Sequence, residues 1–207
     1  MVCAGNKSTD KAVVAQMSTA LQSRLIHFEL VASVPEFTEY ATKEEFDYRI
    51  ISFVNFMPSK LMDFKPDHSD KTFACPRTYE FLSRLTKGRE ITAEMAPRIA
   101  GTIGSGVGTL FMTFAKEFDR LPKLADIVRD PSSVPIPDEA STKYATISML
   151  IENGNEENIE PIIDYVERFA MELQIVFTRG FNVRHPKLRA QNRYLSKYIQ
   201  RMLRYLK

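Results

Sequence analysis

A run of glycines between residues 99 and 111 is the stretch whose residue types most strongly suggest nucleotide chemistry. It reads IAGTIGSGVGTLF and holds four of the chain's eight glycines. A loop that binds a nucleoside triphosphate requires the pattern G-x-x-x-x-G-K-[ST], because the lysine contacts the outer phosphates. Gly101 and Gly106 have the right separation, but Val107 and Gly108 stand where the lysine and the hydroxyl residue are needed. We therefore expect a close contact or a sharp junction between two helices here, not a phosphate loop.

Other catalytic patterns are also missing from the sequence. Cys3 and Cys75 have no histidine at a recognisable spacing and match no metal-ligand spacing, and no serine lies in a G-x-S-x-G turn. The three histidines are far apart, which disfavours a histidine metal site. Acid pairs such as those at 44–45 and 156–157 are most simply solvated faces or helix starts. The sequence therefore contains no self-sufficient catalytic constellation.

Three polar residues become informative through their order along the chain. Asn6 ends the apolar stretch VCAGN, Arg24 stands before the alternating stretch LIHFEL, and Arg77 lies in CPRTYEFLSRL, at the expected start of a helix. Each has a simple structural explanation as a turn asparagine, a solvated arginine or a helix-start arginine. Their chemistry depends on which elements position them.

The first 33 residues are expected to form a small α/β unit. Residues 1–4 and 24–30 have the β character and the alternation of strands, and residues 10–21 have the apolar spacing of a helix. Two strands and one helix do not form a stable sheet by themselves. This unit is therefore expected to need partner strands from another polypeptide.

The remainder of the chain is predicted to be almost entirely helical. A connector rich in proline and serine at 130–138 marks the best internal boundary, which divides the chain into units 1–33, 34–130 and 131–207. The expected elements after the connector are helices over about 139–152, 157–179 (ended by Gly180) and 188 onward.

In this order the motifs resemble the C-terminal half of an AAA+ ATPase of the MoxR-like group, of the type found in bacteria and phages. The resemblance continues through the stretches FVNFMPSKLMDFKP and PRTYEFLSRL, which look like the helical lid, and YVERFAMELQIVFTRG, which looks like the C-terminal helical extension. It implies that Asn6 is sensor 1, which orients the attacking water, and that Arg24 is the arginine finger. It also implies that Arg77 is sensor 2, the nucleotide-contacting arginine of the lid. Tyr79 stands where such proteins often have tryptophan, a mild departure.

The resemblance also implies ATP and Mg²⁺ as cofactors, a ring-shaped homo-oligomer, and a protein substrate or partner. However, the 207 residues contain no Walker A motif and no apolar strand that ends in the adjacent acids of Walker B. The family carries both motifs ahead of sensor 1. We therefore expect a split or truncated ATPase, or one translated from an internal methionine, that neither holds Mg-ATP tightly nor hydrolyses it until the Walker half is supplied.

Composition and charge limit the cellular compartments and partners expected for the chain. The chain is 44% hydrophobic and 26% charged, which is ordinary for a water-soluble domain, and it shows neither a membrane-length apolar run nor a signal-peptide pattern. Few cysteines and no export signal favour the cytoplasm. No membrane partner is expected.

The C-terminal segment carries most of the charge asymmetry. Residues 179–207 contain nine lysines or arginines and no acid, although the whole chain has a net charge of only +2. Such a segment can bind nucleic acid through phosphate contacts, with Tyr194, Tyr198 and Tyr205 available for stacking. The simpler interpretation is an amphipathic helix that packs on the preceding helix and leaves its charges in solvent. The alternative to the ATPase hypothesis is thus a non-catalytic helical module that binds nucleic acid or a partner protein.

Overall fold

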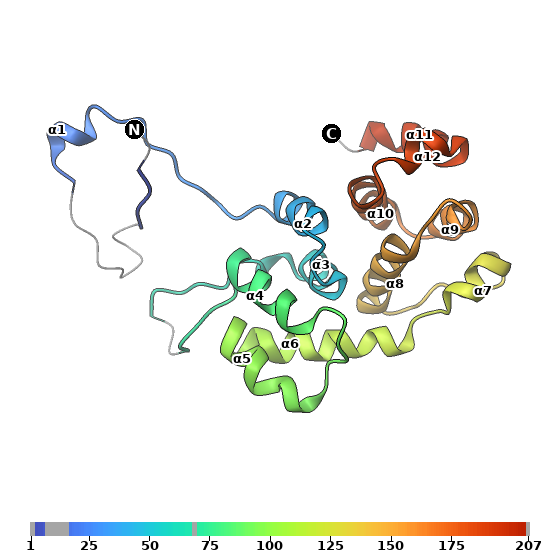
Figure 1. Cartoon of the computed structure of the whole chain (residues 1–207), viewed down its shortest axis with the longest axis horizontal. Helices are drawn as coiled ribbons and strands as arrows, with labels where there is room; N and C mark the ends of the chain where they lie inside the picture. Colours follow the sequence, from blue (N-terminus) through green and yellow to red (C-terminus); the bar gives the residue numbers. More distant parts are fainter. Residues whose placement is uncertain (1–2, 7–16, 68–69, 206–207) are drawn as a thin grey trace.

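The computed structural model describes residues 3–6, 17–67 and 70–205 and consists of helices and their connections (Figure 1). The prediction of a mainly helical chain is confirmed. None of the described residues forms a strand. No helix within these segments is long and apolar enough to cross a membrane.

The N-terminal segment runs outside the helical body (Figure 1). Its described helix is α1 (Thr19–Gln22), and residues 26–33, which we call the arm, then lead without regular structure into the body. The strand predicted over 24–30 is not formed, because a strand needs a neighbour for its backbone hydrogen bonds and none of the described residues supplies one. Of the other two predicted elements, residues 3–6 are irregular, whereas residues 1–2 and 7–16 lie outside the described part.

The first half of the body surrounds an aromatic-rich core. Its elements are α2 (Val34–Lys43), α3 (Tyr48–Phe56), η2 (Pro58–Lys60), α4 (Pro76–Thr86), η3 (Ala93–Met95), α5 (Ala96–Ile103), α6 (Ser105–Ala115) and η4 (Lys116–Arg120). Phe53 of α3 is fully buried and packs edge-to-face on Phe111 of α6, with ring centroids 5.6 Å apart. Such aromatic pairs fix the relative positions of these helices.

The second half surrounds a core of aliphatic and aromatic side chains that is closed by the C-terminal helices. Its elements are α7 (Leu124–Arg129), α8 (Ala140–Asn153), α9 (Ile159–Val166), α10 (Met171–Arg184), α11 (Leu188–Gln191), α12 (Arg193–Met202) and η5 (Leu203–Tyr205). Tyr165 of α9 is fully buried and its hydroxyl donates to the Pro135 carbonyl at 2.9 Å. That bond ties the connector ahead of α8 to the core.

Helix α8 joins the two halves. All six residues from 145 to 150 are buried, so this helix has no solvent face over almost two turns. Ala145 packs into the first core, whereas Ile147 and Leu150 pack into the second. Helices α3 and α10 lie against it from the two halves. One body therefore carries all candidate sites except those on the N-terminal segment.

The predicted helix over 139–152 agrees with α8 to within a residue, but the helix predicted over 157–179 is wrong. The chain instead forms α9 and α10, separated by a turn at residues 167–170. Gly180 does not end α10, which continues to Arg184, because the glycine is used for packing. A Cβ at Gly180 would lie 2.8 Å from the Ile151 side chain of α8.

Candidate functional site

The three residues predicted to contact a nucleotide lie on separate elements. Asn6 is exposed in an irregular segment, Arg24 is exposed just after α1, and Arg77 is exposed in the first turn of α4. The Arg24 guanidinium donates to the Ala20 carbonyl. Within the described ranges, no hydrogen bond or ion pair joins any two of the three residues. The chain by itself does not assemble them into one site.

The start of α4, where Arg77 lies, is fixed by hydrogen bonds of the neighbouring residues. Pro76 occupies the first turn, and the Cys75 backbone N–H donates to the Thr78 hydroxyl at 2.9 Å. The next residue, Tyr79, is fully buried and its hydroxyl donates to the Lys60 carbonyl at 2.7 Å. Burial raises the pKa of Tyr79 far above its usual value. These contacts hold the first turn in place and keep Arg77 at a fixed position on the surface.

The glycine cluster forms the predicted sharp junction between α5 and α6. Gly104 ends α5 and precedes α6 with φ 85°, a conformation that non-glycine residues rarely adopt. A Cβ on Gly108 would lie 3.3 Å from the Ala100 backbone, so this glycine lets the two helices approach closely. The structural interpretation of IAGTIGSGVGTLF is confirmed.

The start of α6 is already neutralised by a carboxylate of the protein. Asp70 accepts a hydrogen bond from the Ser105 backbone N–H at 3.2 Å and one from the Ser105 hydroxyl at 3.0 Å. A helix start attracts anions because its N–H groups lack partners. Here an aspartate takes that place, which disfavours a phosphate at the same position.

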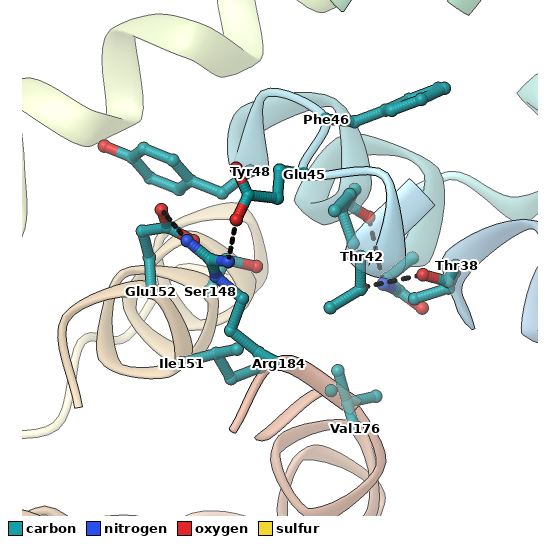
Figure 2. Close-up of a pocket in the computed structure, with 13 residues that line it drawn as sticks. Thr38, Thr42, Glu45, Phe46, Tyr48, Ser148, Ile151, Glu152, Val176 and Arg184 are labelled. Atoms are coloured by element: carbon teal, nitrogen blue, oxygen red, sulfur yellow. Dashed lines mark hydrogen bonds and ion pairs between the residues drawn. The ribbon is translucent and has the colours of Figure 1, made fainter. Parts of the chain in front are cut away.

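A small cavity where α2, α3, α8 and α10 meet is lined by an ion-pair cluster (Figure 2). Arg184 of α10 donates to Glu152 of α8 at 3.1 Å and to Glu45, after α2, at 2.9 Å. Lys87 approaches the second Glu45 oxygen at 3.6 Å. The cavity volume is about 30 Å³, enough for a water molecule and too small for a metabolite. This cluster joins the two halves of the body, and its carboxylates are engaged by cations.

The backbone at Glu45 explains why this residue can reach Arg184. The Phe46 N–H donates to the Ala41 carbonyl at 2.8 Å and the Glu45 N–H to the Thr42 carbonyl at 3.2 Å, which is a Schellman helix end. Glu45 has φ 52°, in the left-handed region where glycine is usual. The hydrogen bond from Arg184 lowers the pKa of Glu45, and the hydrogen bond to Glu152 raises the pKa of Arg184.

A groove of about 510 Å³ lies between α2 and α10. Its apolar lining includes Ile199 of α12 and Leu203 of η5, and its polar lining includes Glu36 and Glu39 on α2 and Arg189 on α11. No histidine, cysteine, serine or tyrosine is among the described residues that line it. This lining is suited to binding a peptide or small molecule.

The described residues form no metal-binding group and no thiol with a catalytic partner. No group of three or more histidine, cysteine, aspartate or glutamate side chains with metal-binding geometry occurs in the described residues. Cys3 is exposed and Cys75 is half-buried, and both are free thiols.

The C-terminal helix α12 packs its apolar side inward, as the simpler interpretation of the basic segment predicts. Leu195, Tyr198, Ile199 and Met202 are only 1–2% exposed and belong to the second core. Tyr198 is therefore not available for stacking, whereas Tyr194 and Tyr205 are each 40% exposed. The charged side of the helix stays in solvent.

The sequence patterns missed one buried polar cluster. The Asp47 carboxylate accepts from the Arg49 guanidinium at 2.6 Å and from the Thr86 hydroxyl at 2.7 Å, and the Asp47 backbone N–H donates to the Ser83 hydroxyl at 2.8 Å. Aspartate just before an apolar run is a helix-cap signal, so the cap itself was detectable. Its partners on α4 lie 36 and 39 residues away, and no local sequence pattern could detect them.

Comparison with protein families, curated proteins and solved structures finds no match to this chain. The functional assignment therefore depends on the residues themselves.

Proposed function

We propose that this chain is the sensor-and-lid part of a MoxR-like AAA+ ATPase, whose Walker A and Walker B motifs are supplied outside these 207 residues. In this proposal residues 1–33 complete the α/β core, residues 34–130 form the lid, and residues 131–207 form a helical extension. The cofactors of the assembled protein are ATP and Mg²⁺. The order of Asn6, Arg24 and Arg77 along the sequence motivates the assignment.

The arm is the observation that carries this proposal. Ile26, Phe28 and Leu30 alternate along it and are 83%, 86% and 96% exposed, and the adjacent Val31 is 77% exposed. Exposed apolar side chains at alternate positions, on backbone that forms no strand ladder with the described residues, are typical of a strand outside its sheet. The α/β core of an AAA+ protein is a sheet that would bury these side chains and pair this backbone.

The chain's own residues suit the roles proposed for them. Arginine keeps its charge and presents a planar fork of donors to phosphate oxygens, so Arg24 and Arg77 are suited to stabilising charge on the transferred phosphoryl group. Asn6 offers an amide that can orient water. ATP and Mg²⁺ supply the reacting phosphate and neutralise its charge. Neither the glycine junction nor the described carboxylates provide a cradle for the triphosphate, so the Walker half must hold it.

Assembly would then control activity. An arginine donated across a subunit boundary requires neighbouring copies, which is why we propose a ring-shaped homo-oligomer with a protein substrate or partner. A cytoplasmic location fits this proposal. The alternative, a non-catalytic helical module that binds a partner protein or nucleic acid, is favoured by the cationic side of α12 and by the groove between α2 and α10.

The arm can be tested by hydrogen exchange followed by mass spectrometry. The chain is measured alone and after co-expression with the polypeptide encoded immediately upstream, in the same or the preceding reading frame. We expect the arm amides to exchange at the rate of unfolded chain when alone and to become protected in the complex.

A matched pair of variants sharpens the experiment. Phe28→Asp should abolish both the complex and the protection, because it would bury a charge in the sheet, whereas Met62→Asp, at a site 48% exposed, should change neither. An upstream polypeptide without Walker motifs, or an arm that stays unprotected in a stable complex, would refute the proposal.

A further inference from the structure

The solvent side of α12 and of the following turn η5 carries a row of three cations and one amide, which we call the cationic stripe. It consists of Arg193, Lys197, Gln200 and Arg204, all of which are exposed. Spacings of four and three residues place Arg193, Lys197 and Gln200 along one line of α12, opposite the buried Leu195, Tyr198, Ile199 and Met202, and Arg204 follows in η5. The stripe thus presents three positive charges and one amide, without an acidic side chain.

Nearby carboxylates are engaged on one flank of α12. Arg201 forms an ion pair with Glu167, and the Tyr194 hydroxyl donates to Asp164. Both contacts join α12 to α9. By contrast, Arg193, Lys197 and Arg204 have no carboxylate partner among the described residues. The acids of α9 therefore hold the flank of the helix and leave the stripe positive.

The opposite flank of α12 faces the groove. Leu203 lies there, and Glu36 and Glu39 line the same groove from α2. These carboxylates therefore belong to the wall formed by α2, separate from the surface that the stripe occupies.

The stripe is held rigid by the packing beneath it. With a rise of about 1.5 Å per residue, Arg193 and Arg204 are about 16 Å apart along the helix, and Arg193 and Lys197 about 6 Å. One DNA strand carries a phosphate about every 3.4 Å along its axis, so the stripe spans about five phosphates. Arg204 lies over the Tyr205 ring at 4.9 Å, which limits the positions of its guanidinium. The packing fixes the backbone of α12, whereas the exposed side chains of Arg193 and Lys197 lose rotamer freedom when an anion binds.

We propose that the cationic stripe binds the sugar–phosphate backbone of nucleic acid, independently of base sequence. Its three cations contact phosphates, and Gln200 donates to a further backbone oxygen. The proposal stands apart from the ATPase assignment, because the stripe lies at the opposite end of the chain from the arm and uses none of the predicted sensor residues.

The composition of the surface favours nucleic acid over a membrane. Helices that bind a lipid surface insert apolar side chains between headgroups. The apolar side of α12 is instead buried in the core, with each side chain 1–2% exposed. The exposed Leu203 lies on the flank that lines the groove, outside this row, and a row of three charges and one amide matches a repeating phosphate chain.

Fluorescence anisotropy with a short labelled DNA duplex of arbitrary sequence tests this proposal. The variant Arg193→Gln, Lys197→Gln, Arg204→Gln is compared with a control that also loses three exposed cations, Lys116→Gln, Arg120→Gln, Lys123→Gln. Each lost phosphate contact makes the dependence of log K on log salt shallower by about 0.9. The stripe variant should therefore be shallower by about 2.7 and bind about five hundredfold more weakly at about 0.1 M salt.

The control variant should keep the slope and affinity of the natural chain. An unchanged slope in the stripe variant, or an equal loss in the control variant, would overturn the proposal. Competition by polyglutamate that matches competition by unlabelled duplex would also overturn it, since the surface would then recognise acidic protein. Circular dichroism must show that all three proteins keep the same helix content.

Discussion

Replacing Asp47 by alanine should destabilise the first half of the body more than any surface substitution. The Asp47 side chain is 2% exposed and the Arg49 side chain 13% exposed, at a charge separation of 2.6 Å. Asp47 also accepts from the Thr86 hydroxyl and caps α3 through the Arg49 backbone N–H at 3.0 Å. Removing the carboxylate leaves the guanidinium with only the carbonyls of Thr86 and Arg89.

The magnitude follows from this burial. Breaking a buried ion pair costs about 3–5 kcal/mol, because the remaining charge stays in a poorly solvated place. We expect the free energy of unfolding to fall by about that amount for Asp47→Ala. Asp47→Asn keeps the cap acceptor and the shape, so it should cost less, about 2 kcal/mol.

Urea unfolding followed by circular dichroism measures this loss. For a urea dependence of about 2–3 kcal/mol per molar, the midpoint for Asp47→Ala should fall by about 1–2 M. The control is Asp126→Ala, which removes an exposed ion pair with Arg129 at 2.9 Å and should cost less than about 1 kcal/mol. Equal costs for the two alanine variants would refute the claim that the Asp47 cluster holds α3 to α4.

The other predictions concern the helix junctions and two titrating groups. Gly104→Ala should lose about 1 kcal/mol or more because φ is 85°, whereas Gly106→Ala, which meets open space inside α6, should be neutral or stabilising, as thermal unfolding would show. Arg184 lowers the pKa of Glu45 from its usual value of 4.5. The ion pair therefore stabilises the fold above pH 4.5, and this stabilisation is lost as the pH falls through the lower pKa that Glu45 has in the folded protein. The stability difference between the natural chain and Glu45→Gln should therefore shrink in acid, and a constant difference would contradict the contact. The pKa of Tyr194 is raised to about 12, first by its hydrogen bond to Asp164, so Asp164→Asn should move it toward about 10 in an NMR titration of the tyrosine ring.

Local sequence patterns were sufficient to predict much of the helical body. The amphipathic pattern of the C-terminal segment predicted that α12 buries its apolar side, and the glycine cluster predicted the junction between α5 and α6. The predicted helix over 139–152 ends within one residue of the end of α8. In each case the residues that decide the structure lie within a few positions of one another.

The failures involve contacts between residues far apart in sequence. Gly180 looked like a helix end, but α10 continues because Gly180 packs against Ile151 of α8. The carboxylate at the start of α6 comes from Asp70, 35 residues earlier. The strand predicted at 24–30 had the right alternation but no partner strand among the described residues, so local pattern alone could not determine its conformation.

The chemical roles of Arg24, Asn6 and Arg77 depend on a nucleotide and on neighbouring subunits, which no pattern within one chain can position. What the chain itself determines is where each residue is displayed. Arg77 is held at the start of α4, whereas Arg24 lies two residues before the arm, whose apolar side chains are exposed.

ATP turnover by the co-expressed complex tests the central claim most directly. The proposal predicts no turnover by the 207-residue chain alone and measurable turnover once the polypeptide with the Walker motifs is present. Arg24→Ala should abolish turnover while leaving ATP binding nearly intact, and Arg98→Ala, at another exposed arginine, should change neither. Hydrolysis by the purified chain alone, or an Arg24→Ala complex as active as the unmodified one, would contradict it.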